Sequence, residues 1–369
     1  MLSTSENELL TRVAGDAPMG RMMRRYWLPA CLSEEPVAGG APVAIRMLGE
    51  EILVTRDAAG GVRAGRYPAR EAGDMVWTYL GPFECQPVFP AYDFLAAPKE
   101  RRAIVKIGQR TNYLQAVEGA IDSAHSWFLH RGTARDWARR NEVSSDTSPR
   151  LEAEDTPYGF RYAAIRRPNV DPEHLQYVRV TNYVLPTTAL IPRPLDPEQH
   201  THVQIFVPCD DTSTMFYGLY ITQDGRALSV DGMREKMGGR PGLDLDERWF
   251  KRSGAADWFK QDRAAMKAGD WSGIYGIPNQ DMACQESMGP VVDRTLEHLG
   301  TSDIAVIRMR RRMLESVVRF VDGGAPIGLD ARWPHERVRS EQKIIPLDQP
   351  WQSVGAYAGE YAPAAAALS

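Results

Sequence analysis

The stretch NYLQAVEGAIDSAHSWFLH, residues 112–130, joins an apolar helical pattern to an aspartate and two histidines. Its first part predicts a helix with one apolar face. Asp122 and His125 are spaced i, i+3 and would share a face of that helix. His125 and His130 are spaced i, i+5, which points them apart on an ideal helix. Both imidazoles can therefore approach one atom only if the helix distorts or ends between them, and the nearby Gly132 allows such an end.

The two histidines are unusual for this chain, which has only seven. Two imidazoles and an ionisable carboxylate are costly to bury unless they are paired or bound to a metal. For the H-x4-H spacing alone, two core histidines beside a surface aspartate remain the alternative interpretation. Two histidines and one carboxylate that leave positions open form the facial triad of non-haem Fe(II) oxygenases. The apolar context favours this second interpretation and predicts an iron site.

The third iron ligand has to come from elsewhere in the chain. Asp122 lies within one helical turn of the first histidine, so it is better placed to orient that ring and fix its tautomer. The segment IPNQDMACQESMGP (277–290) offers the best donor. Asp281 follows a predicted Pro-Asn-Gln turn and leads into apolar residues, so its carboxylate is expected to face inward. Glu286 is an alternative, and so is Asp293, whose neighbours indicate a solvated face.

Strand and helix patterns surround this segment. Alternating apolar runs predict strands over 42–48, 51–56, 75–81, 103–109, 159–167, 177–186, 202–208 and 214–222. A long amphipathic helix is predicted over 302–321, where Ile304, Ile307, Leu314, Val317 and Val321 stand near helical spacing. Strands followed by a long helix indicate an α+β fold, in which an antiparallel sheet grips the C-terminal helix.

Two short helices are expected before the first strands. Ser5-x-x-Glu8 fits a capping box that would open a helix over residues 6–13. The run MGRMMRRYW predicts a second helix over residues 19–27. Much later, residues 224–256 are rich in Gly, Asp and Arg, which predicts an irregular stretch.

Composition limits the classes of function. The chain has 369 residues, of which 43% are hydrophobic and 25% charged, as in ordinary globular enzymes. A net charge of −4 gives no overall basic field, so nucleic acid is not an expected partner. The sequence predicts neither a signal peptide nor a membrane span. Four cysteines without paired spacing argue against a disulfide framework and a zinc ribbon, and we expect a cytoplasmic protein.

Three longer segments match one family. They are NELLTRV…APMGRMMRRYWLPACLS, NYLQAVEGAIDSAHSWFLHRG and NQDMACQESMGPVVDRTLEHLGTSD. Together they resemble the phthalate dioxygenase type of Rieske oxygenase α subunit, from near residue 5 to near residue 320. The resemblance implies that the D-x2-H-x4-H element supplies two iron ligands, His125 and His130, and that Asp281 is the third. It also implies that Asp122 links the iron to a Rieske centre on the neighbouring subunit of a trimer.

The same resemblance implies a fold and a reaction. Residues 102–369 would form a helix-grip (START/Bet v1-like) catalytic domain, preceded in residues 1–101 by a small β platform. A mononuclear Fe(II) would use O2 as co-substrate to hydroxylate, or oxidatively demethylate, an aromatic or similarly apolar substrate. A reductase would supply the electrons, and the chains would assemble as a homotrimer.

One departure from the family is large. A Rieske 2Fe–2S centre needs two cysteines and two histidines, which the family carries in its N-terminal half as C-x-H…C-x2-H. Here His125 is the first histidine, and no cysteine lies between Cys31 and Cys85. A short link around Ala64-Gly65-Arg66 is predicted to replace the cluster-binding subdomain. We therefore predict no 2Fe–2S cluster in this chain and electron supply in trans, from a separate Rieske or ferredoxin protein.

A second interpretation is an inactive or truncated homologue that binds an apolar ligand, because a helix-grip fold encloses a cavity. Aromatic candidates for its lining are Tyr113, Trp127, Phe128, Phe206, Phe216 and Tyr217, although each is also an ordinary core residue. Arginines that could bind a carboxylated substrate are Arg161, Arg166, Arg179 and Arg319, but surface ion pairs explain most arginines and none is assigned. His200 and His202 are predicted to be structural.

Overall fold

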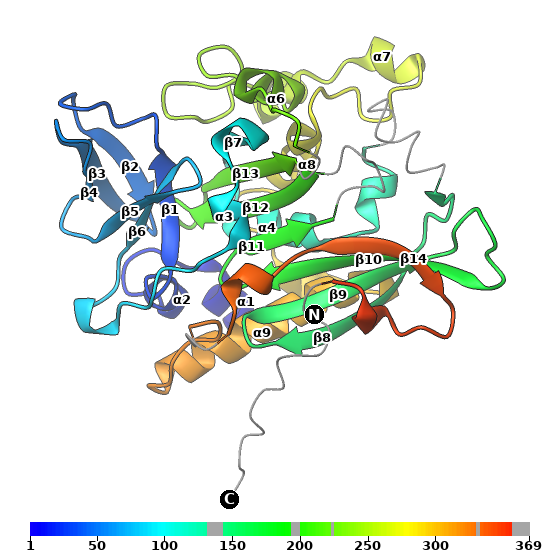
Figure 1. Ribbon diagram of the computed structural model, residues 1–369. Helices are drawn as coiled ribbons and strands as arrows, with labels where there is room; N and C mark the ends of the chain where they lie inside the picture. The colour runs from blue at the N-terminus through cyan, green and yellow to red at the C-terminus, as the bar shows by residue number, and fades with distance from the viewer. Residues whose placement is uncertain (131–142, 193–199, 223–224, 330–332, 356–369) are drawn as a thin grey trace, which may run out of the picture.

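The main body of the protein is an eight-stranded antiparallel sheet. The computed structural model describes residues 1–130, 143–192, 200–222, 225–329 and 333–355. The strands run in the order β7-β13-β12-β11-β10-β9-β8, with β14 paired to β10 (Figure 1). They are β7 (Arg102–Gln109), β8 (Arg150–Thr156), β9 (Gly159–Arg166), β10 (Leu175–Val184), β11 (Thr188–Ile191), β12 (His200–Pro208), β13 (Thr214–Thr222) and β14 (Glu341–Pro346). All five strands predicted in this part are present, whereas β8, β11 and β14 were not predicted.

Several strands of the large sheet are buried on both faces. β9 and β13 are buried at every position, which explains their nearly continuous apolar sequence. On β13, the Tyr217 hydroxyl donates to the carbonyl oxygen of Ala30 at 2.9 Å. The adjacent Phe216 lines a cavity instead. Because successive side chains point to opposite faces of a strand, the sheet separates this cavity from the N-terminal elements.

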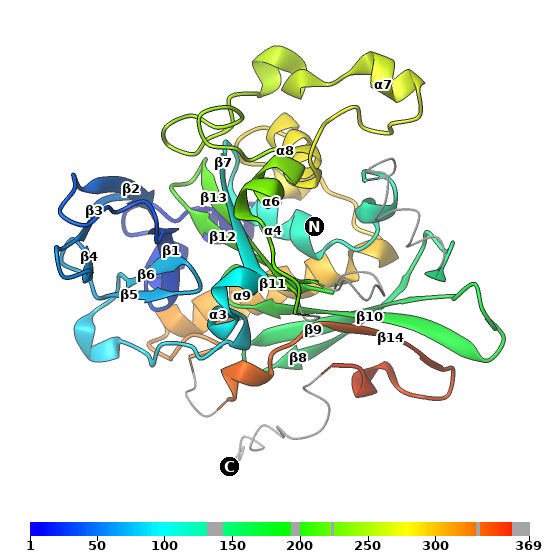
Figure 2. The ribbon, with the colours of Figure 1, turned by 45° about the horizontal axis from the view of Figure 1, so that its top comes forward.

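The helices lie around this sheet. They are α1 (Thr4–Thr11), α2 (Pro18–Met23), α3 (Asp93–Ala96), α4 (Tyr113–Ile121), α6 (Val230–Lys236), α7 (Arg263–Lys267), α8 (Ile277–Ser287) and α9 (Ile304–Val321). The predicted long helix is α9, which packs along β8 and β9 in both ribbon views (Figures 1 and 2). The predicted α+β class is confirmed. The prediction that residues 224–256 are irregular was partly wrong, because α6 forms within this stretch.

An ion-pair network fixes α4, the helix that leads to the histidines, against α9. The Glu118 carboxylate accepts hydrogen bonds from Arg294 at 2.9 Å and from Arg310 of α9 at 2.7 Å. Arg294 is fully buried, and Arg310 also pairs with Glu297. Buried charges of this kind are stable only when they are paired and hydrogen-bonded. The network therefore holds the C-terminal end of α4 at a defined place in the interior.

The N-terminal strands form two three-stranded sheets beside the large one, at the left of Figure 1. One has the order β1-β6-β5 and the other β2-β3-β4. The strands are β1 (Trp27–Leu32), β2 (Val43–Met47), β3 (Glu50–Arg56), β4 (Val62–Ala64), β5 (Ala69–Ala72) and β6 (Met75–Tyr79). The two sheets are joined by the predicted short link, where Gly65 has a φ of 55° and its N–H donates to the Leu53 carbonyl oxygen at 2.9 Å. The Tyr67 N–H donates to the Ala64 carbonyl oxygen at 2.9 Å, so the link connects β4 to β5 by a hydrogen-bonded turn.

Both N-terminal helices differ from their predicted bounds. The capping box of α1 uses Ser3 and Glu6, two residues earlier than the predicted Ser5 and Glu8. Helix α2 ends at Met23, and the apolar end of its predicted run belongs to β1 instead. A fully buried strand and a short helix have similar apolar composition, so the boundary between them was not readable from composition.

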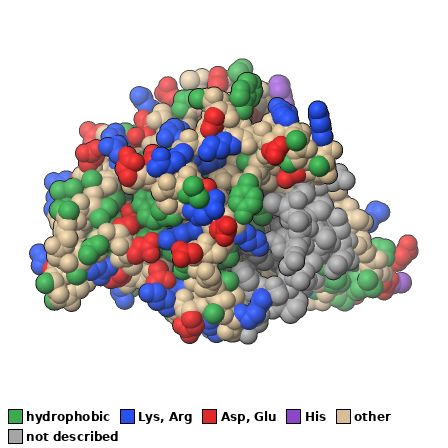
Figure 3. All heavy atoms as spheres, turned by 90° about the horizontal axis from the view of Figure 1, so that it is seen from above, with side chains coloured by type: hydrophobic (Ala, Val, Ile, Leu, Met, Phe, Trp, Pro, Cys, Tyr) green, Lys and Arg blue, Asp and Glu red, His purple; other side chains and the backbone are tan. Residues whose placement is uncertain are grey.

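The surface charge and the hydropathy of the helices agree with what the composition indicated. Basic and acidic side chains are interspersed over the face seen in Figure 3. Within the described ranges, no helix combines the length and the apolar character that crossing a bilayer requires. The division at residue 101 and the name helix-grip stay predictions.

Candidate metal centre

Helix α4 ends just before the predicted site. Its first turn is fixed by Asn112, whose side-chain oxygen accepts from the Leu114 N–H at 3.1 Å. Its C-cap is Asp122, in an extended conformation. The Asp122 carboxylate then accepts from the backbone N–H groups of Ala124 at 2.8 Å and His125 at 3.2 Å. The chain thus turns at Asp122 into a short 3-10 helix. The helix predicted to reach His125 is four residues shorter, and its end precedes both histidines rather than separating them.

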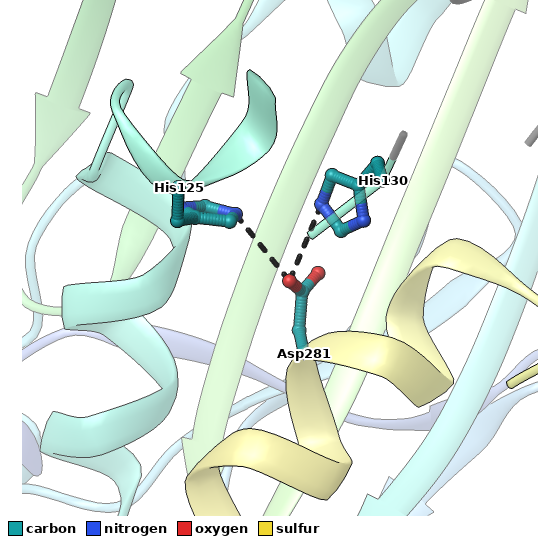
Figure 4. Close-up of side chains that lie close together, drawn as sticks. All are labelled: His125, His130 and Asp281. Carbon is teal, nitrogen blue, oxygen red and sulfur yellow. Dashed lines mark ion pairs between the residues drawn. The ribbon is translucent and has the colours of Figure 1, made fainter. Parts of the chain in front are cut away.

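Three side chains meet where the turn faces helix α8 (Figure 4). The Nε2 atoms of His125 and His130 lie 3.4 and 3.3 Å from Oδ1 of Asp281. One ligand atom from each residue lies within 4.8 Å of the others. Ligands held at right angles around an ion at about 2.1 Å stand about 3 Å apart. The two nitrogens and one oxygen therefore have the spacing and the chemistry of a non-haem iron site.

The two alternative candidates for the third ligand make their contacts away from the histidines. Glu286 accepts from the backbone N–H of Arg110 at 3.0 Å, and Asp293 caps a 3-10 turn through Thr295. The predicted turn before Asp281 is wrong, because Asp281 lies inside α8 after Pro278 in its first turn. A proline is well tolerated at that end of a helix.

A buried glutamine orients the second histidine. His130 Nδ1 lies 2.7 Å from Oε1 of Gln280, while Nε2 of Gln280 donates to the Ile274 carbonyl oxygen at 2.9 Å. The carbonyl partner fixes the amide orientation, so Oε1 accepts a hydrogen bond from the Nδ1–H of His130. Nε2 of His130 is then left with a lone pair directed at the site. No pattern in the sequence singled out Gln280, apart from its position next to Asp281.

Charges around the first histidine favour a cation. Burial alone would raise the pKa of Asp281, but the imidazoles of His130 and His125 lower it well below its usual value. Burial would lower the pKa of His125, yet Asp122 and Asp281 raise it to about 10. His125 Nδ1 lies 3.3 Å from Oδ2 of Asp122, whose pKa is lowered, against its burial, by that imidazole. A proton or a metal ion is needed between these carboxylates, and metal binding would release the proton.

A cavity of about 120 Å³ adjoins the three side chains. Its apolar lining includes Ile191, Phe206, Phe216, Met237 and Met282, and its polar lining includes Gln109, Arg179, His202, Gln204 and Gln285. Of the six aromatic candidates, only Phe206 and Phe216 line it. Tyr113 and Tyr217 hydrogen-bond to the N-terminal region, Trp127 is buried outside the lining, and Phe128 is exposed. His202 stacks on Tyr220 with ring centroids 4.4 Å apart, so it has a place in the cavity wall.

One of the four arginine candidates faces this cavity. Arg179 donates to the carbonyl oxygen of Pro192, and its buried Nε has no hydrogen-bond partner among the residues that the structure describes. Arg166, buried nearby, donates to the Ser123 carbonyl oxygen at 3.1 Å, but its Nε and Nη1 have no partner in the described part of the chain. Burial, together with the charge of Arg179, lowers the pKa of Arg166 to about 10. Neither guanidinium has an ion pair among the described residues, whereas Arg161 pairs with Glu154.

Known proteins share this sequence over most of its length. Residues 78–368 match the family described as LigXa C-terminal domain like. The chain is 37% identical to the phthalate 4,5-dioxygenase oxygenase subunit of Pseudomonas putida, over 95% of this chain and 94% of that protein. It is 28% identical to the 3-chlorobenzoate-3,4-dioxygenase oxygenase subunit of Comamonas testosteroni, over 96% of this chain and 98% of that protein.

Solved structures share the fold. The terminal oxygenase of carbazole 1,9a-dioxygenase from Nocardioides aromaticivorans IC177 superposes with a TM-score of 0.51 at 15% identity, over 85% of this chain and 96% of that chain. A variant of NdmA from Pseudomonas putida CBB5, solved with caffeine, gives a TM-score of 0.53 at 15% identity, over 83% of this chain and 94% of that chain.

The alignment to the phthalate relative is longer than this chain. The alignment to the phthalate relative has 425 positions but uses only 95% of the 369 residues, so about 75 of its positions have no counterpart here. The matched family covers well over half of the chain, and the identity to the phthalate relative extends across nearly all of it. The chain therefore belongs to the phthalate dioxygenase-type family of Rieske oxygenase subunits.

Proposed function

We propose that this protein is a mononuclear non-haem Fe(II) oxygenase that acts on an aromatic substrate with O2 as co-substrate. The observation that carries the proposal is the convergence of His125, His130 and Asp281 on one point beside a cavity. These three side chains would hold the iron and leave positions open towards the cavity. When bound, the iron supplies O2 activation for hydroxylation of a ring or oxidative demethylation.

The protein's own residues set the site up for that chemistry. Gln280 holds the tautomer of His130 by accepting from Nδ1, and Asp122 stands 3.3 Å behind Nδ1 of His125. We assign Asp122 the role of a positioning residue, which can also take up or release a proton at His125 Nδ1. The apolar wall with Phe206 and Phe216 excludes water from the reacting region.

Metal analysis tests the site. Protein loaded with Fe(II) under anaerobic conditions is expected to hold about one iron per chain, and His125→Ala should lose most of it. His174→Ala is the matched control, because His174 is exposed and pairs with Asp171 far from the cavity. Equal iron in the His125→Ala variant and the wild type would exclude this site.

We further propose that the substrate is a single-ring aromatic carboxylate. A cavity of about 120 Å³ has the scale of one that accepts benzene, about 150 Å³. The guanidinium of Arg179 in its wall, which has no ion pair among the described residues, favours an anion, as does the nearby Arg166. Both relatives are named for aromatic carboxylates, phthalate and 3-chlorobenzoate.

Arg179→Gln tests the substrate class. It should raise the Kd for benzoate about tenfold to hundredfold, since a charge-assisted hydrogen bond contributes about 1.5–3 kcal/mol. Arg161→Gln, which removes an arginine paired to Glu154 outside the cavity, should leave that Kd within about twofold. An unchanged Kd for Arg179→Gln would contradict the anion assignment.

We propose that electrons arrive in trans from a separate Rieske or ferredoxin protein and its reductase, and that this chain carries no 2Fe–2S cluster. Supporting this, the first histidine of the sequence is His125, and β4 joins β5 by a short turn at Gly65. The phthalate relative has about 75 aligned positions that this chain lacks. Substrate-dependent O2 consumption should appear only when both donor proteins are added. Binding of benzoate without turnover would indicate the alternative, an inactive ligand-binding homologue.

The assembly and the location of the protein stay predictions. We propose a homotrimer, which size-exclusion chromatography with light scattering measures directly.

A further inference from the structure

We propose that Gln109 is a specificity-determining residue that recognises a hydroxyl group on the aromatic ring of the substrate. The inference rests on the proposed function, because it places the ring in the cavity beside the candidate metal centre. Gln109 is the last residue of β7 and belongs to the cavity wall. It was not singled out in the sequence, where it follows an apolar strand pattern.

The amide of Gln109 is buried and has no hydrogen-bond partner in the described ranges. The residue has no exposed surface, and both Nε2 and Oε1 lack a hydrogen bond among the described residues. A buried amide without partners typically costs about 1–3 kcal/mol. Native proteins retain few such groups, and the ones that persist call for an explanation. Because Gln109 belongs to the cavity wall, a ligand in the cavity is the simplest partner for its amide.

The surroundings of Gln109 keep the amide in place. β7 pairs with β13, where Thr214 stands opposite Gln109, and Phe216 lies two residues further along β13. Phe216 and Gln109 both contribute to the cavity wall. Backbone pairing on β7 and a packed aromatic neighbour give the amide little freedom to find another partner.

The polar groups of the cavity are divided between charged and neutral ones. Arg179 carries a positive charge for a carboxylate, whereas Gln109, Gln204 and Gln285 are neutral amides from three different elements. Gln285 lies one helical turn after Asp281 on α8, so the same helix face presents a candidate metal ligand and an amide. A ring bound through its carboxylate at Arg179 would therefore meet neutral amides with its other substituents.

Hydrogen-bond capacity selects the substituent. A carboxylate can accept from Nε2 of Gln109 but offers no hydrogen to Oε1. A halogen or a methyl group satisfies neither atom. A hydroxyl accepts from Nε2 and donates to Oε1 through a single oxygen atom. The structure therefore assigns a hydroxylated aromatic carboxylate, rather than an unsubstituted one, to this cavity.

Calorimetric binding of benzoate and of 2-, 3- and 4-hydroxybenzoate tests the assignment without requiring turnover. At least one hydroxybenzoate should bind wild-type protein about tenfold or more tightly than benzoate, as two hydrogen bonds predict. In Gln109→Met, which keeps the side-chain length and removes the amide, that preference should fall to about twofold or less. Phe216→Leu is the matched control from the adjacent strand, and it should weaken all four ligands alike while keeping the preference.

Thermal unfolding separates a recognition role from a structural one. If the amide of Gln109 forms hydrogen bonds only to a bound ligand, it is unsatisfied in the free protein. Gln109→Met then removes an unsatisfied buried group and should raise Tm by about 2–4 °C. If the amide instead supports the fold through hydrogen bonds, the same change should lower Tm. A lower Tm, or a preference for hydroxybenzoate that survives in Gln109→Met, would overturn the inference. Failure of wild-type protein to bind any of the four ligands would overturn the substrate class as well, while leaving the iron measurement unaffected.

Discussion

At the scale of single residues, the site depends on which groups stand behind the three candidate ligands. Gln280 and Asp122 contact the nitrogen atoms of His130 and His125 that face away from Asp281. Such partners fix ring orientation and protonation without touching the metal. The sequence predicted Asp122 in this role, since it precedes His125 by one turn. It did not predict Gln280, because a glutamine carries no sequence pattern of its own.

Replacement of Asp122 tests its positioning role. Asp122→Asn keeps the shape but removes the charge behind His125, so the affinity for Fe(II) should fall about tenfold to hundredfold. Anaerobic titration with Fe(II) measures this change. Asp171→Asn is the control, because Asp171 forms a comparable i, i+3 contact with the exposed His174. Unchanged affinity in Asp122→Asn would leave Asp122 with no role at the metal.

The affinity for Fe(II) should also depend on pH. The pKa of His125 is raised to about 10 in the metal-free protein, so the ring is protonated at neutral pH. Iron binding needs the neutral ring and releases that proton, whereas Asp281, with its lowered pKa, is already ionised. Affinity should therefore rise with pH, about tenfold per unit between roughly pH 6 and pH 8. Titrations with Fe(II) at pH 6 and pH 8 measure this change. Equal affinities at the two pH values would mean that iron binding displaces no proton.

At the scale of elements, the end of α4 decides where the histidines point. The amphipathic pattern predicted that a helix exists here, but the Asx turn at Asp122 ends it at Ile121. The same limit applies to α9. Its existence was predicted, yet Ile307 and Val321 of the predicted apolar stripe are 45% and 60% exposed, while Met309 and Met313 are buried. Periodicity shows that a helix has an apolar face, but the neighbouring elements decide which side is covered.

The ion-pair network that holds α4 should be sensitive to mutation. Glu118→Gln leaves Arg294 and Arg310 buried with less compensation, so the free energy of unfolding should fall by about 3 kcal/mol. Urea denaturation followed by circular dichroism measures the loss. Glu315→Gln on α9 serves as the control, because Glu315 is 54% exposed and its pair with Arg312 should contribute less than about 1 kcal/mol. Equal losses in both variants would mean that the network does not fix α4.

At the scale of the whole molecule, the site joins segments about 150 residues apart. His130 comes after α4, and Asp281 lies on α8. Metal binding should therefore stabilise the entire fold, because the unfolded chain does not hold these groups together. At a free Fe(II) concentration one hundred times the Kd, the gain is about 2.7 kcal/mol. Calorimetry should show a higher Tm with Fe(II) in wild-type protein and no shift in His130→Ala.

The sequence by itself determined the α+β class, five strands of the large sheet, the long helix and the family. Those features depend on local periodicity and on motifs that stay within a few residues. The sequence favoured Asp281 over Glu286 and Asp293 as the third ligand, but only the tertiary structure shows it next to the two histidines. The tertiary structure alone showed that, among the described residues, the amide of Gln109 has no hydrogen-bond partner and the guanidinium of Arg179 has no ion pair. The reason is physical: partners and burial depend on contacts between distant segments, and no local pattern in the chain encodes which of several similar side chains will meet.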